Sequence, residues 1–328
     1  NSKKMKFDRI KQIFYICVLT HNLMTGKFAR ISVIILLIVV CSCKNNTRKT
    51  GEIPFPVIDS VTIAESEKLS EEAIADIVQN VSSPVEIASM LQTLSVPFSA
   101  DFICTTKGSD QLTTNYEKAL MLGIFGADLG YLNMYEKTGN SLEIVSSIKQ
   151  LADGLRVGQF FDYESIKRLS VNRTNVDSLL YISVSAYNKI DEYLRSNDRG
   201  SLSALMITGV WLEGQYFACR VVTGTPDKKL KDRIGEQKII LNDLLMLLRP
   251  YKDTSKEYSR LYNMMEQLGN QYREIRITYK VAEPQTVEQD GRLVLIQKEE
   301  SIVEMTDDQL NKIIGLTLDI RNKLISGE

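Results

Sequence analysis

The chain has 328 residues, of which 44% are hydrophobic and 25% are charged. Its 40 basic and 41 acidic residues nearly cancel, so no overall excess of positive charge is available for binding nucleic acid. The single histidine is His21, near the start of the sequence, which excludes a Ser-His-Asp or Cys-His catalytic device and a histidine-ligated metal site from the remainder.

An apolar run that ends in cysteine is the most specific signal in the sequence. Lys27 and Arg30 precede the mostly apolar run 31–40, which has the length of a signal-peptide core and is too short to span a bilayer. Ser42 and Cys43 then resemble the end of a bacterial lipobox, in which a small residue precedes the cysteine that is lipidated. We therefore expect lipid attachment at Cys43, with an ordinary cleaved signal or an uncleaved anchor as the alternatives.

This signal divides the chain into three parts. Residues 1–42 are expected to be a leader with a lipoprotein signal peptide, 43–63 a flexible tether that contains Pro54 and Pro56, and 64–328 a single helical domain. The leader holds seven basic residues and one acidic residue, so 33 basic and 40 acidic residues remain after it. This balance argues further against a nucleic-acid partner.

Capping signals and apolar spacing predict an all-α fold, either a multi-helix bundle or an irregular array of antiparallel helix pairs. N-capping patterns begin at Thr114, Thr254 and Thr306, each followed three residues later by Glu or Gln. The predicted helices cover 69–81, 84–95, 114–138, 141–157, 162–171, 174–198, 201–223, 226–249, 255–281 and 306–325. Short connections between them favour antiparallel neighbours.

One stretch near the C-terminus departs from the helical pattern. Two strand-like runs flank Asp290-Gly291, a dipeptide typical of tight hairpin turns. We expect a small β-hairpin inserted at about 286–296. Because a lone hairpin is marginally stable in water, it should pack on the helices or contact a partner.

Two predicted helices, 119–135 and 202–222, are apolar on nearly all sides, as is typical of central helices in a bundle. Gly126 and Gly130 predict a close approach of a neighbouring backbone to the first of them. Each helix also carries one acid, Asp128 or Glu213, and a buried carboxylate needs a partner. Arg220, a tyrosine hydroxyl or a ligand could supply it.

Besides plain exposure to solvent, two interpretations of these acids stay open. One is a structural hydrogen-bond network. The other is a ligand cleft in which the two carboxyl groups have raised pKa values and serve as acid and base. The residues expected to line such a cleft are Asp128, Tyr131, Trp211, Glu213, Tyr216 and Arg220.

Other chemistry is not indicated. Cys104 and Cys219 are either buried small hydrophobic residues or a disulfide pair. The chain has no glycine-rich phosphate loop, calcium loop or paired Cys-x-x-Cys motif. No metal, no cofactor and no catalytic residue is therefore assigned.

Three segments carry a resemblance to a known group of proteins. The run 118–131, Gln150-Leu151-Ala152-Asp153 and Val210-Trp211-Leu212-Glu213-Gly214 are similar to a family of uncharacterised helical lipoproteins of the Bacteroides group. The resemblance implies an extracytoplasmic all-helical fold and brings no activity. Bacteria of this type often direct lipoproteins to the cell surface when acids closely follow the cysteine. Residues 44–47 contain none, so we expect outer-membrane anchoring on the periplasmic face.

These observations favour a membrane-tethered binding or scaffolding module for an envelope protein or peptide. A small-ligand binder or a carboxylate-dependent enzyme, with a central cleft at Asp128 and Glu213, is the alternative. A purely structural envelope protein is a third. A pocket that joins the two acids would favour the enzyme, whereas acids sealed within the core would favour the other two functions.

Overall fold

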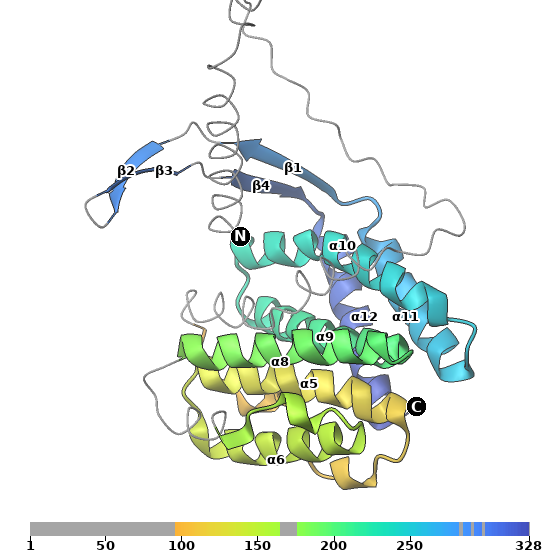
Figure 1. Ribbon diagram of the computed structural model, residues 1–328. Coiled ribbons are helices and arrows are strands. Elements are labelled where there is room, and N and C mark those ends of the chain that lie inside the picture. The colour runs from red at the N-terminus through yellow and green to blue at the C-terminus, as the bar shows by residue number, and fades with distance from the viewer. Residues whose placement is uncertain (1–95, 165–175, 282–284, 290–291, 297–298, 328) are drawn as a thin grey trace, which may run out of the picture. The chain divides into compact units, whose positions relative to one another are not determined.

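Helices dominate the computed structural model, of which we describe residues 96–164, 176–281, 285–289, 292–296 and 299–327 (Figure 1). These ranges contain seven α-helices and two pairs of antiparallel strands. The predicted all-α class with a hairpin near the C-terminus is thereby confirmed. Several predicted segments lie outside the described residues: the predicted leader and tether, the helices predicted at 69–81 and 84–95, most of the helix predicted at 162–171, and the predicted Asp290-Gly291 turn.

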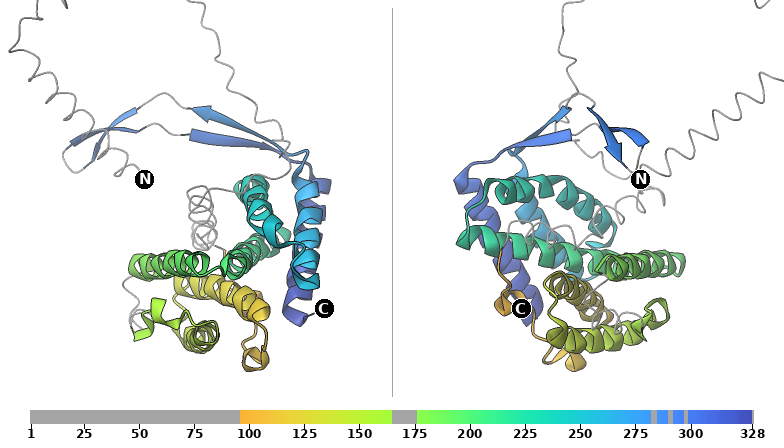
Figure 2. Two further views of the ribbon diagram at one scale, coloured as in Figure 1. Left: turned by 45° about the vertical axis from the view of Figure 1, so that its right-hand side comes forward. Right: turned by 90° about the vertical axis from the view of Figure 1, so that its left-hand side faces the viewer.

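The helices of the described ranges lie close to the predicted segments, except that α11 ends well before its predicted end. Their bounds are α5 Asn115–Met134, α6 Thr138–Gly154, α8 Val176–Ser196, α9 Gly200–Gly224, α10 Lys228–Leu248, α11 Lys256–Tyr272 and α12 Asp307–Ser326. Figures 1 and 2 show α9 between α10 and α5, with α6 on the other side of α5.

Helix starts are encoded locally where a full capping box is present. Thr114 caps α5 and Thr306 caps α12, and in each case the side chain of the third helical residue closes the box on the backbone of the threonine. The caps of α10 and α11 lie close to the predicted starts. Asp227 accepts from the backbone N–H of Leu230, and Ser255, not Thr254, caps α11.

Helices α5 and α9 pack with their backbones in direct contact. A Cβ atom on Gly209 would overlap the carbonyl oxygen of Leu120, and one on Gly123 would overlap that of Met206. The absence of side chains at both glycines therefore lets the two backbones touch. The sequence placed such a contact at Gly126 and Gly130, but Gly126 instead leaves room for the hydroxyl group of Tyr187 from α8.

The hairpin is longer than expected. Strand β2 (Gln285–Gln289) pairs with β3 (Arg292–Ile296), which confirms the predicted strands, and β1 (Arg276–Val281) pairs with β4 (Glu299–Glu304). Three residues separate β1 from β2 and two separate β3 from β4, so the register shifts by one residue between the pairs. The helix predicted to reach residue 281 is wrong beyond Tyr272, because pairing with β4 overrides the helical spacing there.

The β1–β4 pair packs on α10 through β4. The side chain of Val303 occupies the space that a side chain at Gly235 would fill, and the hydroxyl group of Ser301 donates to the Glu236 carboxylate. Lys238 Nζ donates to the carbonyl oxygen of Ile275, 2.7 Å away, at the start of the hairpin. The hairpin therefore packs against the helices, which is the support that an isolated strand pair needs to be stable in water.

Gly209→Ala is expected to lower the free energy of unfolding by about 3 kcal/mol, because the added methyl group must push the backbones of α5 and α9 apart. Gly315→Ala is the matched control, since Gly315 is an exposed helical glycine with no atom near its missing Cβ. It should raise stability by about 0.5–1 kcal/mol. Urea unfolding of both variants measures the difference, and equal effects would contradict the close contact.

Candidate functional site

The two acids that the sequence singled out meet in the core. Asp128 lies on α5 and Glu213 on α9, and both side chains are fully buried. The contact at Gly123 and Gly209 sets this meeting, because each acid follows its glycine by one to one and a half helical turns. The site is therefore built by the same close crossing that holds the two central helices together.

Arg321 on α12 is the partner of Glu213. Its Nε donates to Glu213 Oε2 at 2.9 Å and its terminal nitrogen donates to Oε1 at 2.6 Å, which is a bidentate ion pair. The arginine is itself 9% exposed, and its guanidinium lies over the ring of Tyr216, 4.2 Å from the centroid. We call Asp128, Glu213 and Arg321 the acid–arginine cluster.

Asp128 completes the cluster in a different way. Its Oδ2 accepts from the backbone N–H of Cys104 at 3.2 Å, whereas Oδ1 is buried and receives no hydrogen bond. Burial, and then the charge of Glu213, raise the pKa of Asp128 well above its ordinary value, and the hydrogen bond between the two carboxyl groups acts in the same direction. A protonated Asp128 that donates to Glu213 accounts for the oxygen that accepts nothing.

The cluster is electrically neutral with one proton. Burial raises the pKa of Glu213, but the hydrogen bonds and charge of Arg321 oppose that effect, so the proton belongs on Asp128 and the negative charge on Glu213. One carboxylate and one guanidinium then cancel. Such an arrangement can hold a proton and link α5, α9 and α12, but neither of its acids has any exposed surface.

Arg220, which the sequence offered as a partner for the acids, lies elsewhere. It donates to the hydroxyl group of Tyr216 at 2.9 Å and stacks over the ring of Phe102, 5.1 Å from its centroid. Tyr216 therefore lies between Arg220 and the acid–arginine cluster, because its ring also contacts Arg321.

The other two residues of the predicted cleft point to different neighbours. The Tyr131 hydroxyl accepts from the backbone N–H of Ser99 at 3.0 Å. Trp211 Nε1 donates to Gln237 on α10 at 2.8 Å. The structure thus brings together Asp128, Glu213 and Tyr216, adds Arg220 at their edge, and places the polar groups of Tyr131 and Trp211 in separate contacts.

Sequence reasoning missed Arg321, although one signal could have found it. The buried face of α12 carries Leu310, Ile313, Thr317 and Ile320 at steps of three and four residues, and Arg321 adjoins this stripe. A charge beside an apolar stripe needs a buried counterion, and the two acids of the central helices are the obvious candidates. The backbone contact of Cys104 has no comparable signal.

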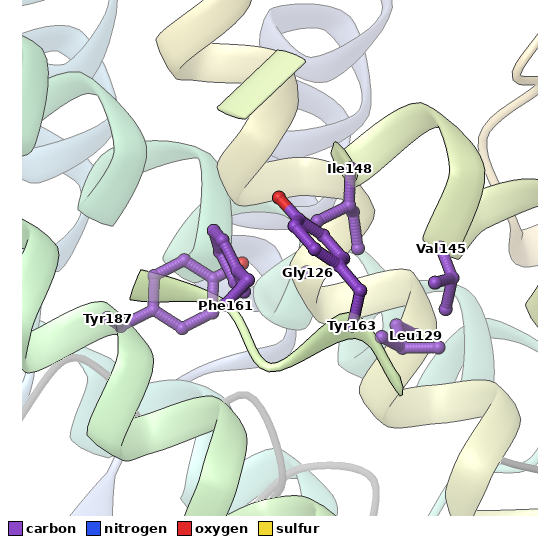
Figure 3. A pocket seen from close by; sticks show the side chains of 7 residues that line it. All are labelled: Gly126, Leu129, Val145, Ile148, Phe161, Tyr163 and Tyr187. Carbon is purple, nitrogen blue, oxygen red and sulfur yellow. The ribbon is translucent and has the colours of Figure 1, made fainter. Parts of the chain in front are cut away.

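A small apolar pocket lies away from the cluster. It is lined by Gly126, Leu129, Val145, Ile148, Phe161, Tyr163 and Tyr187 (Figure 3). The hydroxyl oxygen of Tyr163 is buried without a hydrogen-bond partner, and Lys149 Nζ lies 4.8 Å from the centroid of its ring. None of the residues of the predicted cleft lines this pocket.

The two cysteines of the helical domain are both buried and unpaired. Burial raises the pKa of the Cys219 thiol to about 12, and it raises that of Cys104 further. Both thiols are therefore neutral and unreactive near pH 7. Of the two possibilities left open by the sequence, the structure has buried thiols rather than a disulfide.

The described ranges hold no cluster of three or more side chains arranged to bind a metal ion. No helix among them has the length and apolar character needed to cross a membrane. No family model, curated protein sequence or solved structure matches the chain.

Asp128→Asn is expected to be at least as stable as the wild type at pH 7. An amide can donate to Glu213 and accept from Cys104 as the protonated acid does. The wild type must keep a proton whose folded-state pKa is raised, so its stability falls as the pH rises from about 4, the ordinary aspartate value, toward that pKa. The asparagine variant lacks this dependence. The difference in free energy of unfolding between Asp128→Asn and the wild type should therefore grow, in favour of the variant, as the pH rises.

Urea unfolding at several pH values between 4 and 7 measures this difference. Asp128→Ala is the control, because it also lacks the titrating group but removes both hydrogen bonds, so it should be about 2–4 kcal/mol less stable than Asp128→Asn at every pH in the range. A difference between asparagine and wild type that does not vary with pH would show that Asp128 is ionised in the fold.

Glu213→Ala should cost about 3–5 kcal/mol, because it leaves the Arg321 charge buried without its partner. Asp319→Ala breaks an ion pair on the same helix, Asp319–Lys323, in which both side chains are about half exposed. That control should change the free energy of unfolding little. Similar losses in the two variants would contradict a buried, essential ion pair.

Proposed function

We propose that the protein is a membrane-tethered extracytoplasmic lipoprotein that acts as a binding or scaffolding module for an envelope protein or peptide. The observation that carries this proposal is that the acids of the acid–arginine cluster are buried and that Glu213 is paired with Arg321. The cluster's two acids and one arginine satisfy one another inside the core, so the strongest candidates for acid–base chemistry are occupied by structural contacts.

The tether supplies the second part of the proposal. Cys43 follows Ser42 at the end of the apolar run, in the arrangement that resembles a lipobox. Since no acid follows within residues 44–47, the proposed location is the periplasmic face of the outer membrane. The resemblance to helical lipoproteins of the Bacteroides group supports the same location.

The alternative, an enzyme or small-ligand binder at the two acids, would need the core to open. A carboxylate-dependent enzyme or small-ligand binder at Asp128 and Glu213 would require substrate to reach two side chains that have no exposed surface. It would also require Arg321 to release Glu213. A binding module needs neither event, because it acts through its surface.

Cys43→Ala is expected to move the protein from the membrane fraction to the soluble periplasmic fraction, because the lipid is the proposed anchor. Cell fractionation followed by alkaline extraction measures the distribution. Cys104→Ala serves as the control, since it removes a buried thiol and leaves the proposed anchor intact. Membrane attachment that persists in Cys43→Ala would contradict lipid anchoring at this residue.

The binding role is tested by crosslinking in intact cells. A photoreactive residue is placed at exposed positions such as Leu142, in the lipidated protein and in its Asp128→Asn variant. A recurring envelope protein captured equally by both supports a surface scaffold. A small molecule that co-purifies with the wild type and is lost in Asp128→Asn would instead support the ligand cleft.

A further inference from the structure

One edge of the hairpin is open among the described residues. Strand β1 pairs with β4 alone, and β4 contributes the contacts with α10. Figures 1 and 2 show β4 between β1 and α10, so the second edge of β1 faces away from the helices. Among its residues, Arg276, Thr278 and Lys280 are exposed.

An edge of this kind offers main-chain hydrogen bonds. In an antiparallel pair, alternate residues bond to the partner strand, and the others direct their N–H and C=O groups outward. Alternate residues of β1 therefore direct these groups toward its outer edge, where a strand could be added. Addition of an extended segment to such an edge is a recurrent mode of peptide recognition.

The charges along β1 define what could be added. Arg276 and Lys280 are four residues apart, so they lie on one face of the strand. Their register partners on β4 are Glu304 and Glu300. Each cation therefore has an acid opposite it on one side and an open position on the other. An added strand would gain cross-strand attraction by placing acids at these two open positions.

Two candidates for the added strand, a second copy of β1 and the tether of the same chain, do not place acids opposite Arg276 and Lys280. An antiparallel β1 from a second copy would bring basic side chains opposite basic side chains, which is destabilising. The tether of the same chain carries only two acids, Glu52 and Asp59, and they are seven residues apart. A segment of another protein, with acids four residues apart, satisfies the spacing.

We propose that the outer edge of β1 is a strand-addition site for an extended acidic segment of a partner protein, with acidic residues opposite Arg276 and Lys280. This inference rests on the proposed binding function and names the class of partner. Main-chain bonds supply the affinity, and the two cations select acidic segments over basic ones. The same cations discourage self-association through this edge.

The test uses the whole protein and a capped synthetic peptide with two glutamates four positions apart, separated by alternating valine and threonine. Binding should protect the backbone amides of β1 from hydrogen exchange. Arg276→Glu/Lys280→Glu should weaken binding at least about tenfold and create binding of the peptide that has lysines in place of the glutamates. Lys312→Glu/Lys323→Glu is the matched control, because it makes the same charge change on exposed α12 positions.

Three results would overturn the site: no protection of β1 up to the solubility limit of the peptide, equal binding by the two double variants, or equal binding by an N-methylated peptide that lacks outward N–H groups. Crosslinking separates this failure from failure of the proposed function. If Arg276→Glu/Lys280→Glu retains an envelope partner, the scaffold stands and the β1 site is rejected. If the peptide binds but cells yield no partner, the site stands and the scaffold is rejected.

Discussion

The burial of α9 on all sides is the constraint on which the rest of the described structure depends. A helix without a solvent-facing side must satisfy its polar side chains through its own backbone, as Thr208 does, or through a neighbouring helix, since an unpaired buried group costs about 1–3 kcal/mol. Its polar contacts reach α8 through Ser203 and Asp191, α10 through Trp211 and Gln237, α11 through Gln215 and Tyr272, and α12 through Glu213 and Arg321. Each bond fixes the rotation of one surrounding helix, so the helix that is least exposed specifies the arrangement.

The acid–arginine cluster is the most demanding of these contacts. A lone carboxylate would cost several kcal/mol to bury, and two would repel one another as well. Arg321 neutralises one acid and a proton neutralises the other, so no net charge remains in the core. Two ionised acids facing one arginine would leave an excess negative charge without solvent to screen it. Burial therefore determines both the geometry of the cluster and its protonation state.

Local signals predicted the parts of this fold that depend on neighbours in sequence. The capping boxes at Thr114 and Thr306 and the apolar character of the central helices required no tertiary information. The contacts that hold the acid–arginine cluster together, in contrast, depend on tertiary packing. Arg321 is 108 residues away from Glu213, and the choice between Arg220 and Arg321 depends on how α12 docks. The close backbone contact was likewise predicted at Gly126 but lies at Gly123. Packing decides which of several nearby glycines faces a neighbouring backbone.

The end of α11 shows how a failed local prediction bears on function. Apolar spacing continues past Tyr272, yet the chain leaves the helix there and pairs with residues 299–304. Lys238 stabilises the junction, because its ammonium group donates to the carbonyl oxygens of Arg273 and Ile275, 3.0 and 2.7 Å away. A helix through residue 281 would have satisfied its own backbone groups. Within the described residues, β1 pairs along one edge with β4, so the long-range pairing that ends the helix also forms the strand on which the proposed partner would add.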